Sequence, residues 1–341
     1  MIPHSQPWIT ESELDAVAEV TRSAMLSSGA RGTALEQSLS DLLHKDTTIL
    51  TGSGSQALFL ILKTLEIGPG SEVILPTYVC DKVYHTVRMS GAIPVLCDIG
   101  PHWVMTPETV APLITNHTKA IILVHTFGIK AQTEAFIQLG VPVIEDICQS
   151  LGGWSPANFS GQATQWAFGS FHGTKCISGG EGGFASFAFH AQGSRARNLL
   201  PQLPLVGRMS DVQSALVLAQ LKRYSDFLNQ RRKISSRYLR DLPSAWLSPA
   251  QNIAGASMFF RFPVHIHSSF THIQQQYAIQ GIAVRRGVDA LIHHELGISD
   301  SLFPNAAYAL ENTVSLPILP QLSDEQVQHI IDISHQIYSG L

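Results

Sequence analysis

The sequence is poor in charge and lacks long apolar runs. Charged residues make up 14% of the 341 residues, and the net charge is −4 with a pI near 6.4. A weakly acidic chain argues against nucleic acid as a partner. No apolar run approaches the ~20 residues of a membrane-spanning helix. The first ten residues do not pair a basic segment with an apolar one, as a secretory signal would. We therefore expect a cytoplasmic protein that binds neither nucleic acid nor a membrane.

Cysteine is also scarce, with four residues at positions 80, 97, 148 and 176. Their spacing fits no CxxC motif and no Cys/His metal site. We interpret them as reduced, buried thiols. The 15 histidines are scattered, and the one adjacent pair is His293-His294. Because two neighbouring histidines rarely chelate one metal, we predict that there is no metal site.

Apolar residues are plentiful, at 45% of the chain. In the first half, short β-rich runs alternate with amphipathic helical patterns, which predicts a mainly parallel, doubly wound sheet with helices on both faces. The predicted strands are Thr48–Thr51, Glu72–Pro76, Ile93–Cys97, Ala120–His125, Val141–Glu145, Trp166–Ser170 and Gly183–Phe187. The predicted helices between them are Gln56–Leu65, Lys82–Ser90, Pro107–Ile114 and Thr133–Leu139.

A long helical pattern runs from Ser210 to Leu242, and the pattern changes after about Pro249. Three elements are predicted beyond that point: a strand over Met258–His265, a helix over Phe270–Gln280 and a last helix over Asp324–Ser339. We predict a large α/β domain over residues 1–245 and a small α+β domain over residues 246–341. Ligands of such sheets bind beyond the carboxyl ends of the strands.

The strongest local signal is the segment GSFHGTKCISGGEGG, residues 169–183, which encloses Lys175. Glycines permit close backbone approach and positive φ, and the hydroxyls of Ser170 and Thr174 suit an oxyanion-binding turn. A lysine amine must be neutral to attack a carbonyl, and burial among weakly polar groups favours that form. The alternative is that Lys175 lies on a solvated loop.

Two further motifs precede this segment. Asp146 follows Val143 and Ile144 at the carboxyl end of a strand, where a carboxylate can keep a pyridinium nitrogen protonated. The alternative is that Asp146 caps the next helix. Thr51-Gly-Ser-Gly-Ser55 joins a strand end to a helix start and predicts a phosphate site, although an ordinary helix cap explains it nearly as well.

A phosphate turn, a strand-end aspartate and a glycine-flanked lysine, in that order, match the three attachment points of pyridoxal 5'-phosphate (PLP). The chain resembles the DegT/StrS-type sugar aminotransferases, which are fold-type I PLP enzymes acting on keto-sugar nucleotides. The resemblance covers nearly the whole length. Its segments are Ile2-Pro3, Ser28-Gly29, Leu35-Glu36, residues 53–58, 76–78, 91–98, 124–128, 145–149, 170–175, 180–183, 208–215, 220–221, 303–304 and 315–317.

The resemblance implies a role for each matching residue. Lys175 would form the Schiff base with PLP and later move the proton between cofactor and substrate carbons. Asp146 would pair with the pyridine nitrogen, and Gln149 would lie near the ring's phenolate oxygen. Gly54, Ser55 and Ser170 would hold the phosphate. The resemblance also implies a homodimer, an amino acid such as glutamate as donor, and a keto-sugar nucleotide as acceptor.

Substrate-binding residues are predicted from position. His125 stands at a strand end that faces the cofactor in the family, and the alternative is that this lone histidine is structural. Arg285 and Arg286 follow an expected strand over Gly281–Val284 at the small domain's entrance to the site. As cations they would bind the diphosphate, or they lie in solvent at the surface.

The sequence departs from the family's pattern in three places. Cys80 occupies the position of the aromatic residue that usually stacks on the ring, and Tyr78 could replace it only if the loop shifts. Val206 replaces an asparagine that reaches the neighbouring subunit's phosphate, and the stretch from Phe187 to Arg208 is short. These departures leave two alternatives open: a PLP-dependent sugar dehydratase, against which Lys175 argues because histidine replaces lysine there, or a catalytically silent relative with a binding or regulatory role.

Overall fold

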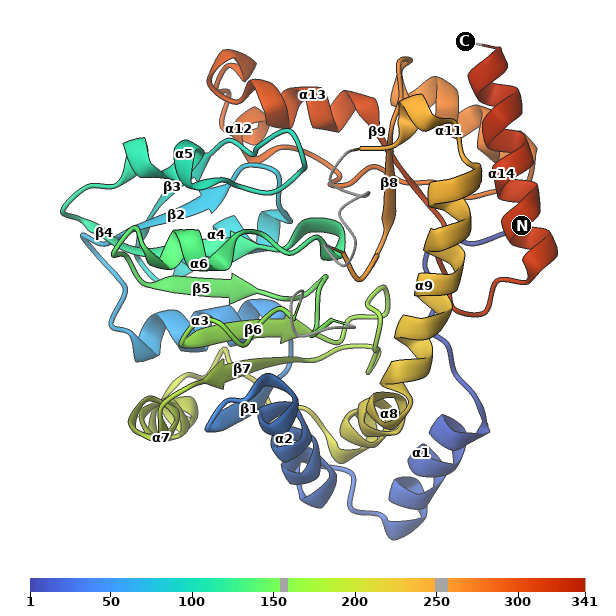
Figure 1. Ribbon diagram of the computed structural model, residues 1–341. Helices are drawn as coiled ribbons and strands as arrows, with labels where there is room; N and C mark the ends of the chain where they lie inside the picture. Colours follow the sequence, from blue (N-terminus) through green and yellow to red (C-terminus); the bar gives the residue numbers. More distant parts are fainter. Residues whose placement is uncertain (154–158, 249–256, 341) are drawn as a thin grey trace.

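The computed structural model describes residues 1–153, 159–248 and 257–340. Its centre is a seven-stranded sheet of order β1-β7-β6-β5-β4-β2-β3 (Figure 1). β7 runs antiparallel to both β1 and β6, and the other neighbours are parallel. The mainly parallel α/β sheet predicted from the sequence is therefore confirmed. The strands are β1 Thr47–Thr51, β2 Glu72–Pro76, β3 Ile93–Cys97, β4 Thr118–Val124, β5 Val143–Asp146, β6 Trp166–Ser170 and β7 Gly183–Phe187.

Helices cover both faces of this sheet because its central strands alternate apolar side chains between two cores. On β4, Ile122 and Val124 pack with the helices α3 and α4, whereas Ile121 and Leu123 pack on the opposite face with Phe136 of α6. The helices of this part are α1 Glu11–Ser23, α2 Ala30–Leu43, α3 Gly54–Thr64, α4 Asp81–Met89, α5 Pro107–Val110, α6 Thr133–Ile137, α7 His190–Leu199 and α8 Asp211–Lys222.

The long helix predicted over Ser210–Leu242 is two helices. α8 ends before Arg223, and α9 runs over Tyr224–Asp241. Ser210 caps α8 with a reciprocal capping box. The helical periodicity continues across the break, which is why the sequence pattern predicted one helix.

A second core lies beside the strand ends of the large sheet (Figure 1). It combines a two-stranded antiparallel sheet with helices and takes in the C-terminal half of α9. Its further elements are β8 Phe262–His265, α11 Phe270–Ile279, β9 Thr313–Leu316 and α14 Asp324–Ser339, whereas α12 Ile292–Glu295 and α13 Pro304–Asn312 pack in other clusters. The division of the chain near residue 245 remains a prediction, since this core also includes Ile234, Tyr238 and Leu242.

The N-terminal segment joins this second core. Ile2 pairs with Ile282 in an isolated parallel bridge, and the two residues are buried together. The strand expected over Gly281–Val284 does not form, because this stretch makes only isolated bridges, here and from Arg285 to Ser315. Among the described residues, no helix has the length and apolarity to cross a membrane.

Candidate active site

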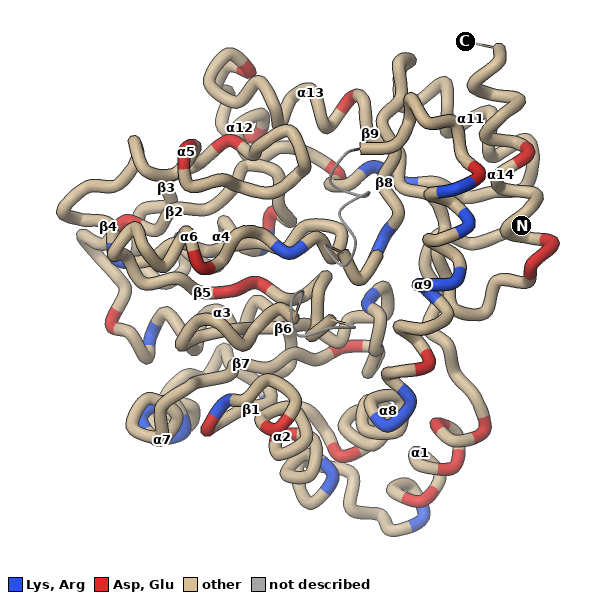
Figure 2. The backbone as a smooth tube through the Cα atoms, in the orientation of Figure 1, with Lys and Arg blue, Asp and Glu red and all other residues tan. Residues whose placement is uncertain are grey.

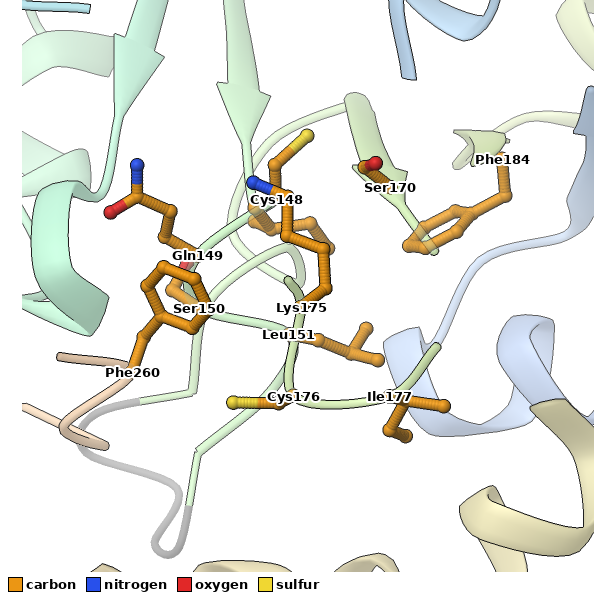
Figure 3. A pocket seen from close by; sticks show the side chains of 11 residues that line it. Cys148, Gln149, Ser150, Leu151, Ser170, Lys175, Cys176, Ile177, Phe184 and Phe260 are labelled. Carbon is orange, nitrogen blue, oxygen red and sulfur yellow. The ribbon is translucent and has the colours of Figure 1, made fainter. Parts of the chain in front are cut away.

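Lys175 lies in the loop that connects β6 to β7, beyond the end of β6. The loop is held by hydrogen bonds from the N–H of Lys175 to the carbonyl of His172 (2.9 Å) and from the N–H of Gly179 to the carbonyl of Phe171 (2.8 Å). Gly180 and Gly182 adopt φ of 78° and 131°, which explains the glycines around the lysine. Lys175 is half-buried and lines a pocket with Cys148, Gln149, Ser170 and Phe260 (Figure 3). It is therefore not on a freely solvated loop.

Asp146 ends β5 and is almost completely buried, with 5% of its surface exposed. Its Oδ1 accepts a hydrogen bond from the N–H of Cys148 at 2.9 Å. Burial raises the pKa of Asp146 above its ordinary value, although the bonds from Cys148 and the charge of Lys175 oppose the rise. Among the described residues no cation lies within 4.0 Å of this carboxylate. A buried carboxylate without a cationic partner suits a ligand that brings its own N–H⁺.

Asp146 does not cap a helix, but it does stabilise a turn. The residues after it, up to Ser150, form a turn and no helix. The bond to the N–H of Cys148 makes Asp146 the first residue of that turn, so it does have a local structural role.

His125 bonds the protein through both of its ring nitrogens. Its Nδ1 accepts from the N–H of Ala131 at 3.0 Å, so the proton is on Nε2, which donates to Oε2 of Glu145 at 2.9 Å. Burial alone would raise the pKa of Glu145, but hydrogen bonds from His125, Gly161 and Thr164 lower it to about 2. Because the nitrogens of His125 are occupied, only its ring face is left for contact with a ligand.

The side chain of Gln149 is oriented by a neighbouring backbone group. Its Oε1 accepts from the N–H of Phe127 at 2.8 Å. A backbone N–H can only donate, so the amide oxygen must face Phe127 and the NH₂ group must point away. Gln149 also lines the Lys175 pocket (Figure 3), where this NH₂ group is a donor for an anionic oxygen.

Gly54 and Ser170 meet at the start of α3. A Cβ on Gly54 would lie 3.1 Å from Cβ of Ser170 and 3.3 Å from the carbonyl oxygen of Gly169, so a side chain would fit only tightly here. Ser53 caps α3 by accepting from the N–H of Gln56, and Ser55 is half-buried in its first turn. A helix N-terminus beside a serine hydroxyl suits a phosphate.

The segment around Val206 lies against this helix within the same chain. The N–H groups of Gly52 and Gly207 both donate to Oε1 of Gln56, each at 3.0 Å. Val206 itself is buried in the core that contains α3. Its side chain therefore packs inside its own chain.

Cys80 and Tyr78 occupy different environments. Cys80 precedes α4 and is exposed. Desolvation raises the pKa of its thiol, and the hydrogen bond from the backbone of Lys82 and the charge of Lys175 oppose the rise. Tyr78 is completely buried in another cluster, edge-on to Phe127 with 6.4 Å between ring centres, and does not line the Lys175 pocket. The loop is therefore not shifted in the way that would bring Tyr78 to the pocket in place of the usual stacking aromatic residue.

The two predicted arginines also differ. Arg286 donates from Nη1 to the carbonyl of Leu310 (2.9 Å) and to Glu311 (2.8 Å), so it is engaged in the second core. Arg285 is exposed and pairs with Ser315 through its backbone. Neither lines the Lys175 pocket.

Several groups at or near the site were not predicted from the sequence. Phe260 lines the pocket from the second core, and Cys148 lines it from the turn after Asp146.

The expectation that all four cysteines are buried is wrong. All four are free, but only Cys97 is buried, and Cys80 is exposed because it stands at a helix start. His293 and His294 both bond Oδ1 of Asp300, at 2.8 and 2.6 Å, in a cluster of metal-ligand type that the sequence did not reveal.

The residues that line the first pocket, together with Asp146 and the start of α3, fit PLP. Asp146 suits the ring nitrogen, the NH₂ group of Gln149 suits the phenolate oxygen, and the start of α3 with Ser170 suits the phosphate. Lys175 extends between Gln149 and Ser170 towards Cys148 (Figure 3). A primary amine placed among these groups can bind a carbonyl covalently and move a proton.

Comparison with known proteins agrees with this chemistry. The family model described as the DegT/DnrJ/EryC1/StrS aminotransferase family matches residues 7–334. A protein of Saccharopolyspora spinosa, dTDP-4-dehydro-2,3,6-trideoxy-D-glucose 4-aminotransferase, is 30% identical over 97% of this chain and 95% of its own. Spr1654 from Streptococcus pneumoniae, solved in its PMP form, aligns over 100% of both chains with a TM-score of 0.91 and 25% identity. The aminotransferase TlmJ from Streptoalloteichus hindustanus covers 100% of this chain and 99% of its own, with a TM-score of 0.90 and 26% identity.

Proposed function

Because the chain belongs to the DegT/DnrJ/EryC1/StrS aminotransferase family, we propose that it transfers an amino group from an amino acid to a keto-sugar nucleotide. It is an aminotransferase, and its cofactor is PLP. The relative from Saccharopolyspora spinosa, whose name specifies a dTDP-linked keto sugar, supports this choice of acceptor. Lys175 in its pocket is the observation that carries the proposal, since the transfer requires an amine beside the cofactor.

When bound, PLP withdraws electrons from the carbon that carries the transferred amine. Lys175 is the base that takes the proton from that carbon at Nζ and returns it elsewhere, because no other described side chain of the pocket is a comparable base. Asp146 holds the proton on the ring nitrogen. A buried carboxylate does this more strongly than an exposed one, because little water screens its charge.

The remaining groups orient the cofactor. The NH₂ group of Gln149 would donate to the phenolate oxygen, and the N–H groups of Gly54 and Ser55 with the hydroxyl of Ser170 would hold the phosphate. Glu145 and His125, joined by their side-chain hydrogen bond, stand beside Asp146: the backbone N–H of His125 donates to the carbonyl of Asp146 at 3.3 Å. This pair supports the strand ends that carry the site.

We also infer a homodimer in the cytoplasm. Leu205 is 62% exposed next to Val206, whose segment contacts the phosphate turn, and Met25 is 74% exposed. Large apolar side chains exposed to solvent favour a covering partner, and a second copy of the chain would cover them. Four free cysteines suit a reducing compartment.

The test is the two half-reactions observed separately. Holoenzyme mixed with L-glutamate should change its cofactor absorption as the amine is transferred, and addition of a keto-sugar nucleotide should restore the spectrum. Lys175→Ala should do neither. If the wild-type spectrum failed to respond to any amino acid, the proposed function would be wrong.

A further inference from the structure

A second pocket adjoins the first and shares Lys175 and Phe260 with it. Its other walls come from Thr174, from His4 of the N-terminal segment, from Arg231 of α9 and from Arg261 just before β8. Figure 2 shows basic positions on α9 and around β8, where the second core faces the strand ends of the large sheet. Of the described residues, three cationic ones and no acidic one line this pocket.

Arg231 is buried with an incomplete set of partners. Only 5% of its surface is exposed. Its Nη1 donates to the carbonyls of Phe259 and Phe260, both at 2.9 Å. Its buried Nε has no hydrogen-bond partner among the described residues, and no acidic group lies within 4.0 Å. A buried guanidinium normally satisfies its donors with a carboxylate or phosphate.

Arg261 repeats this arrangement from another element. Its Nη1 donates to the carbonyls of Arg286 and Gly287, both at 3.1 Å, and its buried Nε is likewise without a partner among the described residues. Burial and then the charge of Arg285 lower the pKa of Arg261 to about 10. An anion beside it would relieve both effects.

The positive charges of three arginines all act on His4. Its ring nitrogens lie 2.8 and 2.9 Å from the hydroxyls of Ser5 and Ser315. Burial lowers its pKa well below the ordinary value, and Arg261, Arg285 and Arg231 lower it further. A neutral imidazole adds no positive charge, so His4 can line the pocket without repelling the arginines.

We propose that Arg231 and Arg261 bind the carboxylate of the amino donor. In an α-amino acid the carboxylate is two bonds from the nitrogen, so its binding groups must border the same space as Nζ of Lys175. Arg261 meets this condition, because it and Lys175 contact the same ring. The centre of the Phe260 ring lies 5.4 Å from Nζ of Lys175 and 5.5 Å from Cζ of Arg261. The diphosphate of a sugar nucleotide is many bonds from the reacting carbon and needs no group there.

The inference rests on the proposed function and assigns the donor's place within that site. The experiment uses holoenzyme in single-turnover reactions with L-glutamate and, for the return reaction, with a keto-sugar nucleotide. Arg231→Met and Arg261→Met should each raise the half-saturating concentration of L-glutamate at least about tenfold, which is the effect of one lost charge-assisted contact. The half-saturating concentration of the nucleotide sugar should stay within about twofold. Calorimetric binding of 2-oxoglutarate to the amine-loaded enzyme should weaken in the same variants.

Controls separate folding and charge from binding. Arg231→Lys keeps a charge and can still donate to one of the two carbonyls, so it remains informative if Arg231→Met does not fold. Arg237→Met removes an arginine of the same helix that contacts Asp324 outside the pocket, and should leave both half-reactions unchanged. In the wild type, L-glutamate should slow the modification of Arg261 by phenylglyoxal.

The outcomes are distinct. If the arginine variants weakened only the nucleotide sugar, the pocket would serve an anionic group of the acceptor and the inference would be wrong. Unchanged constants for both substrates would also overturn it. A wild type that responded to no amino acid would instead overturn the proposed function, whatever the variants did.

Discussion

Nζ of Lys175 lies 5.4 Å from the centre of the Phe260 ring. Lys175 belongs to the loop after β6, whereas Phe260 stands just before β8 in the second core, 85 positions later in the chain. Phe260 and Lys175 both line each of the two pockets. The surroundings of the reactive amine are therefore set by how the second core packs on the strand ends, and a change in that packing would alter both pockets together.

Lys175 should carry the cofactor. Reduction of the holoenzyme with borohydride, followed by peptide mapping, should place the pyridoxyl group on Lys175. Lys175→Ala should lower the rate of amino transfer by roughly 10²–10⁴-fold or more, as expected for loss of a proton-transferring group. Lys63→Ala, on α3, is the matched control and should keep label and rate. A pyridoxyl group on another lysine would refute the assignment.

Asp146 should matter more for the reaction than for folding. In Asp146→Asn the buried charge is gone, and burial disfavours that charge, so the melting temperature of the apoenzyme should be unchanged or higher. The rate should fall about 10²-fold or more, because a neutral amide holds the ring proton poorly. The measurements are thermal melting without cofactor and single-turnover rate with it. Unfolding of the variant with a normal rate in the folded fraction would favour the structural role in the turn.

Gln149 should act through its NH₂ group. Gln149→Glu retains the oxygen that accepts from Phe127 but replaces the donor with an anionic oxygen facing the phenolate. The expected result is a cofactor dissociation constant raised at least tenfold and a shifted absorption maximum. Glu134→Gln on the surface of α6 is a suitable control. Unchanged affinity and spectrum would mean that Gln149 does not contact the ring.

The free energy of unfolding should depend on pH through Glu145. Its folded-state pKa of about 2 lies below the ordinary 4.5, so its contribution to the free energy of unfolding is complete above about pH 4.5 and lost as the pH falls towards 2. By linkage the contribution is about 3 kcal/mol. Urea unfolding from pH 7 to pH 3 should show this decline in the wild type and a lower, flatter profile in Glu145→Gln. Parallel profiles for the two proteins would contradict the prediction.

Much of the large sheet could be predicted because its strands are short apolar runs between turn residues. β2, β3, β6 and β7 have the predicted bounds, and so does α14. Helix ends were less predictable: α8 and α9 share one continuous periodicity, and only the tertiary structure shows the break at Arg223.

For the site, local motifs revealed Lys175 and Asp146, which follow adjacent strands. Phe260, Arg231 and Arg261 gave no such signal. Each stands in a segment that reads as ordinary core or surface, and they reach Lys175 only through packing between distant parts of the chain. The partners of His125 could not be predicted either, because the bond to Glu145 spans neighbouring strands and the bond to Ala131 forms within a loop.

The last prediction separates Arg285 from Arg286 in binding the sugar nucleotide. Arg286 already donates to Leu310 and Glu311, and its guanidinium lies 4.6 Å from the ring centre of Phe270. Exchanging it for alanine should therefore reduce stability, by about 1–2 kcal/mol for the lost contacts, with little effect on either KM. Arg285 is exposed, and its charge lowers the pKa of Arg261, which lines the second pocket, so we expect Arg285 to bind the diphosphate outside that pocket. Arg285→Ala should raise KM for the nucleotide sugar about tenfold and KM for L-glutamate less than twofold.

The measurements are steady-state kinetics with each substrate varied and thermal melting of each variant. Equal effects of Arg285→Ala on both substrates, or none on either, would remove this arginine from the acceptor site.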